Sequence, residues 1–213
     1  YGYRPGRSAK DAIQKVKEYA ERGYIHAVAL DLSKYFDTLN HEILLNILRR
    51  NVRDERVIQW IKRYLKSGVM ENGVVMETEE GSPQGGNLSP LLANIYLNEF
   101  DQEYQKRGVV FVRYADDIVL LAKSERAAKR LLETSTKYLE GPLKLKVNQE
   151  KSRVVSVFAI RTFKFLGFTL GKNGKGIYVR VHGKSWKKMK SKLKELSSRR
   201  SVQSIRPEIG RAH

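Results

Sequence analysis

Two adjacent carboxylates stand at the centre of a strongly β-prone stretch of the chain. Residues 111–121 read Phe-Val-Arg-Tyr-Ala-Asp-Asp-Ile-Val-Leu-Leu, in which two apolar, β-branched runs flank a polar centre. This pattern predicts a short hairpin with Tyr114 to Asp117 at its turn. Asp116 and Asp117 repel each other, which is costly unless a cation or strong hydrogen-bond donors neutralise them. An Asx-type turn between two strands is the alternative explanation.

A third carboxylate follows a second predicted strand. Residues 25–30 (Ile-His-Ala-Val-Ala-Leu) form an apolar run that ends at Asp31. If this strand pairs with the hairpin at the centre of one sheet, Asp31 and Asp116 converge on a single metal site. Oxygen ligands without nearby histidine or cysteine suit Mg²⁺, or Mn²⁺, rather than zinc. The chain contains no cysteine, which excludes disulfides and thiolate metal sites.

Together these motifs resemble the palm of a reverse transcriptase. The Tyr-Ala-Asp-Asp tetrad at 114–117, Asp31, and the segment 82–90 (Ser-Pro-Gln-Gly-Gly-Asn-Leu-Ser-Pro) are most similar to the group II intron maturases, which are intron-encoded reverse transcriptases. The resemblance implies an α/β (α+β) fold, namely a right-hand polymerase palm with a split βαβ core, an antiparallel central sheet, partial fingers and a first thumb helix. It also implies that Asp31, Asp116 and Asp117 are catalytic and bind two Mg²⁺ ions, with Mn²⁺ as a substitute.

The resemblance further implies a nucleotide-binding pocket that includes Leu32. Phe36, five residues after Asp31, resembles the steric gate that excludes a ribose 2′-hydroxyl, although taken alone it would be a core phenylalanine. Gln84 and Gly85 lie in a glycine-rich loop that lets the backbone approach a ligand, and they are expected to line the pocket. The alternative for this loop is an ordinary connection between a strand and a helix.

Two further segments acquire roles from the resemblance. Lys151 matches a lysine near the triphosphate and is expected to stabilise or protonate the leaving pyrophosphate, unless it is one solvated lysine among many. Phe165, Leu166 and Gly167 match the primer grip, a hairpin that holds the growing 3′ end, whereas the mostly apolar run 163–168 would otherwise be core.

The charge balance predicts a polyanionic partner. Lysine and arginine number 41 against 23 acidic residues, which gives a net charge of +18. We expect Arg4 and Arg7, in the turn-rich start, and Lys187 and Lys188, on a basic amphipathic helix, to contact nucleic acid. A basic protein on a membrane surface is the alternative, but no apolar run approaches the ~18 residues that span a bilayer.

The function implied by the resemblance is that of an RNA-directed DNA polymerase. Its partners would be an intron RNA template, a DNA primer and a dNTP, and the protein would also assist intron splicing and mobility as a maturase. One alternative is a splicing cofactor that mainly binds RNA; another is a retron-type or diversity-generating reverse transcriptase. A cytoplasmic location in a bacterium is expected, with an organellar host left open.

The resemblance divides the chain into three parts. Residues 1–24 would be a residual fingers segment, 25–170 the palm with the primer grip, and 171–213 a hairpin with the truncated start of the thumb. Because related proteins have further fingers and a fuller thumb, we expect this chain to bind RNA but to polymerise weakly or not at all.

Local signals predict the elements that position these residues. Helices are expected to start at Ser8 (with Asp11 in a capping box), His41, Asp54, Ser89, Ser124 and Ser185. We expect His41 at the surface or at the first turn of its helix. The helix after Ser89 should present its core face through Leu91, Leu92, Ile95, Tyr96 and Phe100. Asn72-Gly73 predicts a type I′ hairpin, and alternating residues 143–147 predict a strand.

Overall fold

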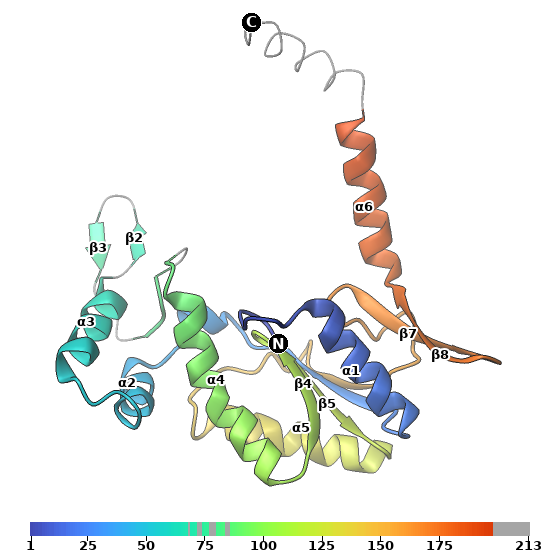
Figure 1. Cartoon of the computed structure of the whole chain (residues 1–213), viewed down its shortest axis with the longest axis horizontal. Helices are drawn as coiled ribbons and strands as arrows, with labels where there is room; N and C mark the ends of the chain where they lie inside the picture. The colour runs from blue at the N-terminus through green and yellow to red at the C-terminus, as the bar shows by residue number, and fades with distance from the viewer. Residues whose placement is uncertain (68, 72–73, 77–79, 84–85, 198–213) are drawn as a thin grey trace, which may run out of the picture.

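A four-stranded antiparallel sheet forms the centre of the molecule (Figure 1). This computed structural model describes residues 1–67, 69–71, 74–76, 80–83 and 86–197. The strands lie in the order β4-β5-β1-β6 and are β4 (Val110–Tyr114), β5 (Asp117–Ala122), β1 (His26–Leu30) and β6 (Arg153–Ser156). β1 therefore pairs with β5, which meets the condition under which Asp31 and Asp116 were expected to converge.

Side chains alternate between the two faces of this sheet and build a core on each. On β5, Ile118 and Leu120 join one core while Val119 and Leu121 join the other. Val28 of β1 is fully buried beside the first pair. Burying one such side chain contributes about 1.5–3 kcal/mol to folding. A register slip by one residue would turn every side chain of the strand to the other face, so several of these contributions would be lost together. This penalty fixes the pairing on which the candidate site depends.

The helices cover both faces. α2 (His41–Arg49), α3 (Glu55–Lys66), α4 (Ser89–Lys106) and α5 (Glu125–Glu140) supply the core that contains Val28. α1 (Ala9–Glu21) covers the opposite face, packing against β4 and β8 (Gly176–Val181). The predicted caps at Ser8, Asp54 and Ser124 are confirmed, because each side chain accepts a hydrogen bond from a backbone N–H of the first helical turn.

Two hairpins and a last helix complete the described chain. β7 (Phe168–Asn173) pairs with β8 (Gly176–Val181), and α6 (Gly183–Leu196) follows and stands away from the sheet (Figure 1). β2 (Val69–Glu71) pairs with β3 (Val74–Met76). The predicted turn residues Asn72 and Gly73 lie outside the described residues. In the part of the chain that the structure describes, no helix is both long and apolar enough to cross a bilayer.

Several local predictions were wrong. Residues 143–147 form no regular strand, because Lys144 has a φ of 48° and only Val147 bridges to Leu32. β6, which the sequence analysis did not predict, instead occupies the sheet edge beside β1. His41 opens α2, which confirms its expected place in the first turn of the helix, but it is buried, and its Nε2 lies 2.6 Å from the Gly81 carbonyl oxygen.

Two predicted helix starts are displaced. Leu88 is the N-cap of α4, since the Ser89 hydroxyl donates to the Pro83 carbonyl and no longer serves as a cap. His182, not Ser185, caps α6, and its Nδ1 accepts from a backbone N–H two residues on. On α4, Leu91 is 54% exposed and does not belong to the core face.

Candidate active site

The sheet register brings the three predicted carboxylates to one end of the sheet. Tyr114 pairs with Asp117, which confirms the predicted hairpin and leaves Ala115 and Asp116 as its two-residue turn. Ala115 has a φ of 53°, in the left-handed region that tight turns require. Leu30 pairs with Ile118, so Asp31, the next residue, continues the register toward Asp117.

The three carboxylates share one negative field. The pKa of Asp117 is raised above its ordinary value, first by desolvation and then by the charges of Asp116 and Asp31. Although the Asp117 side chain is exposed, surrounding protein atoms displace part of its water. The Lys164 ammonium acts in the opposite direction and offsets only part of this repulsion.

The donor chemistry of this group fits a hard divalent cation. All three side chains offer oxygen atoms, and a bound cation would offset the negative charges of Asp116 and Asp31 that help to raise the pKa of Asp117. Their arrangement is open: within the described ranges, no three His, Cys, Asp or Glu side chains are already gathered closely enough to enclose a metal ion.

Lys151 is held beside Asp31 by a turn that is anchored to the Asp31 backbone. Its Nζ lies 3.8 Å from Asp31 Oδ2. The Asn148 N–H donates to the Asp31 carbonyl at 2.8 Å, and the Asp31 N–H donates to Ser152 Oγ at 3.0 Å. The side chain of Asn148 also accepts from the Lys151 N–H. Sequence reasoning did not assign a role to Asn148 or Ser152; asparagine is a typical turn residue, whereas the contact of Ser152 with Asp31 joins residues that are distant in sequence.

Phe36 and Asp116 line the same open pocket. This pocket has a volume of about 680 Å³, and Leu32 also lines it. Phe36 is half-buried, and its ring contacts Tyr35 edge to face with 5.4 Å between centroids. The Tyr35 hydroxyl donates to the Ala93 carbonyl at 2.6 Å, so α4 anchors the aromatic pair. Because the Phe36 ring is fixed at the wall of the pocket that Asp116 also lines, it can exclude ligands sterically.

The loop before α4 is tied to Phe36 on one side. The Ser82 N–H donates to the Phe36 carbonyl at 2.7 Å, and the Ser82 hydroxyl donates to Ser89 Oγ at 2.6 Å. Gln84 and Gly85, the predicted nucleotide contacts in this loop, lie outside the described residues.

The predicted primer-grip residues form a tight turn. Phe165 and Phe168 exchange two backbone hydrogen bonds of 2.9 Å each, and both residues between them, Leu166 and Gly167, have positive φ. The Gly167 carbonyl accepts from the His182 N–H, which attaches this turn to the start of α6. The ammonium of Lys164, the residue before Phe165, lowers the pKa of Asp117.

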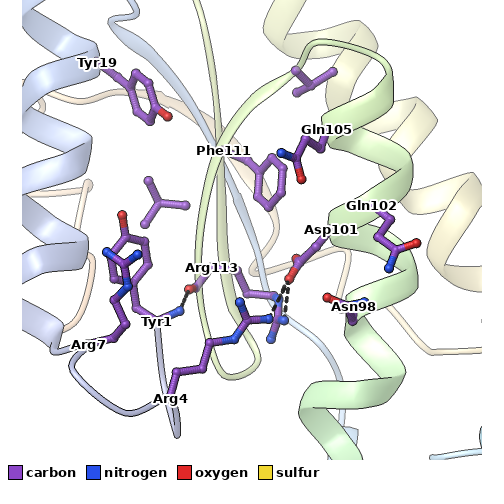
Figure 2. A pocket seen from close by; sticks show the side chains of 12 residues that line it. Tyr1, Arg4, Arg7, Tyr19, Asn98, Asp101, Gln102, Gln105, Phe111 and Arg113 are labelled. Carbon is purple, nitrogen blue, oxygen red and sulfur yellow. Dashed lines mark hydrogen bonds and ion pairs between the residues drawn. The ribbon is translucent and has the colours of Figure 1, made fainter. Parts of the chain in front are cut away.

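The four predicted nucleic-acid contacts lie in two other places. Arg4 and Arg7 line a pocket of about 420 Å³ between α1 and α4, in which Arg4 approaches Asp101 (Figure 2). None of the three candidate catalytic carboxylates lines this pocket. Lys187 and Lys188 are exposed on α6, next to the exposed apolar side chains Trp186, Met189, Leu193 and Leu196.

Comparisons with known proteins give the fold and the site a family context. Residues 1–170 match the family model described as reverse transcriptase (RNA-dependent DNA polymerase). Protein YkfC of Escherichia coli K12 is 34% identical over 80% of this chain and 54% of its own length. Group II intron-encoded protein LtrA of Lactococcus lactis is 31% identical over 73% of this chain and 25% of its own length. The chain therefore spans between a quarter and about half of these relatives.

Solved structures support the same architecture. Apo telomerase from Candida tropicalis, truncated from its C-terminal domain, aligns with a TM-score of 0.60 at 15% identity, covering 81% of this chain and 39% of the telomerase chain. At this identity the likeness concerns the fold alone.

Proposed function

The chain belongs to the reverse transcriptase (RNA-dependent DNA polymerase) family, and from this premise we propose that it extends a DNA primer by copying an RNA template. The reaction is nucleotidyl transfer, in which the primer 3′-hydroxyl attacks the α-phosphorus of a dNTP and pyrophosphate leaves. One observation carries the proposal: the strand register brings Asp31 to the same end of the sheet as the Asp116-Asp117 turn, beside the pocket that Phe36 lines.

In this proposal Asp31, Asp116 and Asp117 hold two Mg²⁺ ions, for which Mn²⁺ substitutes. When bound, such a pair of ions stabilises the attacking and leaving oxygens of an in-line displacement. The carboxylates supply the charge and oxygen ligands, and the β1–β5 pairing fixes their spacing. The reaction requires no nucleophilic side chain, because the nucleophile belongs to the primer.

The pocket residues are proposed to receive the nucleotide. Leu32 and Phe36, which line this pocket, are proposed to form its wall against the sugar, with Phe36 excluding a 2′-hydroxyl. Gln84 and Gly85 are proposed contacts to the base pair. Lys151, which is already within 3.8 Å of Asp31, supplies positive charge to the departing pyrophosphate.

The 165–167 turn is proposed to hold the primer end toward the carboxylates. Its attachment to His182 couples it to α6, whose Lys187 and Lys188 would contact the duplex together with Arg4 and Arg7. We propose the same functional division as the sequence indicates: fingers in 1–24, palm in 25–170, and the start of a thumb from 171 onward.

We also propose that an intron RNA is the natural template and that the chain takes part in its splicing. The similarity to the group II intron-encoded protein LtrA and the net charge of +18 support this assignment. A splicing cofactor without polymerase activity would keep the basic surface and bind RNA equally well, so only catalysis separates the two functions.

Primer extension at enzyme excess tests the proposal. A labelled DNA primer annealed to an RNA template should be extended by dNTPs in the presence of Mg²⁺, and a group II intron RNA should compete for binding. Tight intron binding without any extension, even with Mn²⁺, would favour the splicing cofactor.

A further inference from the structure

Arg113 is a buried cation directly before the Tyr-Ala-Asp-Asp tetrad. Only 4% of the residue is exposed, which is rare for a charged side chain unless it is fully paired. Its side chain lies on the face of β4 that is directed toward α4, and its guanidinium group binds the Asp101 carboxylate there (Figure 2). Nε donates to Asp101 Oδ1 at 2.7 Å, and Nη2 donates to Asp101 Oδ2, so the contact is bidentate.

The remaining nitrogen of this guanidinium group binds the two-residue turn formed by Ala115 and Asp116. Nη1 of Arg113 donates to the Ala115 carbonyl at 2.8 Å and to Asn94 Oδ1 at 2.9 Å. Ala115 immediately precedes Asp116 and has a φ of 53°, a conformation that a residue with a β-carbon adopts only when its surroundings hold it there. The Arg113 side chain therefore joins a strained turn residue to two polar side chains of α4.

A second contact restricts the same turn. A β-carbon at Gly2 would lie 2.7 Å from the Ala115 nitrogen, so only glycine permits this approach. The Gly2 carbonyl in turn accepts from Asn94 Nδ2 at 2.8 Å. Asn94 thus uses its oxygen for Arg113 and its amide nitrogen for the segment that covers Ala115.

We propose that Arg113 is a positioning residue, which sets the orientation of Asp116 and Asp117 toward the metal ions by clamping the Ala115 carbonyl to α4. Lysine could satisfy Asp101, but a single ammonium lacks the planar fork that reaches Asp101, Asn94 and the turn together. The effect of Arg113 on the rate of primer extension rests on the proposed function. Its effect on metal affinity does not.

The experiment compares Arg113→Lys with Arg107→Lys, a control at an exposed arginine that follows α4 and pairs with Glu103. Mn²⁺ binding is measured directly by electron paramagnetic resonance, without substrate, and thermal melting is recorded in EDTA. Altering a residue that orients metal ligands typically weakens metal affinity about 10- to 100-fold. We expect a loss in this range for Arg113→Lys, and a Kd within about twofold of the parent chain for Arg107→Lys.

Single-turnover primer extension provides the second readout. At saturating primer-template, dNTP and Mn²⁺, Arg113→Lys should still react roughly 10²-fold slower, because misplaced reacting groups lower the rate even when binding is complete. The Kd for primer-template should remain within about twofold. Asn94→Ala, which removes one acceptor of Nη1 without changing charge, should shift both quantities in the same direction by less.

Each outcome bears on the proposal. A folded Arg113→Lys chain with unchanged Mn²⁺ affinity and extension rate would overturn it, as would a parent chain that binds no Mn²⁺. If Arg113→Lys does not fold, Asn94→Ala decides, and unchanged Mn²⁺ affinity in that variant overturns the proposal. A parent chain that binds Mn²⁺ but never extends a primer would refute the proposed function, while the Mn²⁺ comparison would still decide the role of Arg113.

Discussion

Lys151 Nζ lies 3.8 Å from Asp31 Oδ2, and the turn that carries the lysine is hydrogen-bonded to the backbone of that same aspartate. Both side chains remain substantially exposed to solvent, at 69% and 44%. An ion pair this exposed contributes at most about 0–1 kcal/mol to folding. The backbone hydrogen bonds therefore hold the Lys151 ammonium next to a proposed metal ligand. We expect this lysine to contribute to catalysis rather than to stability.

Lys151→Ala should reduce primer extension while leaving stability nearly unchanged. Loss of one group that stabilises charge in the transition state costs about 10²–10³-fold in rate. Lys129→Ala is the matched control, because Lys129 is equally exposed and is paired with Glu125 on α5. Single-turnover rates and melting temperatures of both variants give the comparison. Equal rates for the two variants would show that Lys151 is an ordinary solvated lysine.

Phe36→Val should relax the discrimination between deoxynucleotides and ribonucleotides. Phe36 lines the pocket that Asp116 also lines, so a smaller side chain opens space next to the sugar. The ratio of kcat/KM for dNTP to that for rNTP should fall by roughly tenfold or more, since about 1–3 kcal/mol of steric selection is at stake. Phe158→Val, a half-buried phenylalanine in the opposite core, serves as the control. A parallel decrease for both sugars would identify Phe36 as packing alone.

The raised pKa of Asp117 predicts a stability gain when its charge is removed. A carboxyl whose folded pKa exceeds its ordinary value of 3.8 binds more protons in the folded state, so its contribution to stability falls as the pH rises through that window. Asp117→Asn should therefore melt at a higher temperature than the parent chain at pH 7 in EDTA. The difference should shrink as the pH falls below 3.8. A lower melting temperature for Asp117→Asn at pH 7 would contradict the repulsion described for this site.

Nucleic-acid binding should weaken steeply with salt. If the basic surface neutralises six to ten phosphates, affinity should fall roughly 10³–10⁵-fold between 50 and 200 mM salt. Replacing Lys187 and Lys188 together by alanine should lower the logarithmic salt slope by about one for each phosphate that these lysines neutralise. Lys129 and Lys137 on α5 form ion pairs with Glu125 and Glu133, respectively. Replacing these two lysines by alanine should leave the slope unchanged. A shallow slope for the parent chain would mean that its charge is dispersed.

The parts of the fold that were predictable from sequence depend on local interactions. Ser8, Asp54 and Ser124 cap their helices through hydrogen bonds within one turn, which a sequence pattern contains in full. Ser89 has the same signature, yet its hydroxyl bonds with the loop at Pro83, so a tertiary contact overrides the cap. Alternation at 143–147 likewise failed to give a strand, because Lys144 adopts a left-handed conformation there.

The candidate site shows the same division. The two strands could be recognised as apolar runs that adjoin carboxylates, whereas their pairing was only a hypothesis that the register of β1 on β5 bears out. The role of Arg113 could not, since its partner Asp101 lies on a different element and no spacing rule connects them. An arginine inside an otherwise apolar strand was the available signal, because such a charge requires a buried partner.

The role of Asp116 and Asp117 as catalytic carboxylates is tested most directly by primer extension with a chain in which both are replaced by asparagine. We expect extension to fall below detection, with RNA affinity unchanged or slightly tighter, because the change removes two proposed metal ligands and two charges that repel phosphate. The matched control replaces Glu125 and Glu133 by glutamine, which removes two exposed carboxylates of α5 and should leave the extension rate unchanged. Extension by the Asp116 and Asp117 double variant at the parent rate would contradict the assignment of these carboxylates as the catalytic centre.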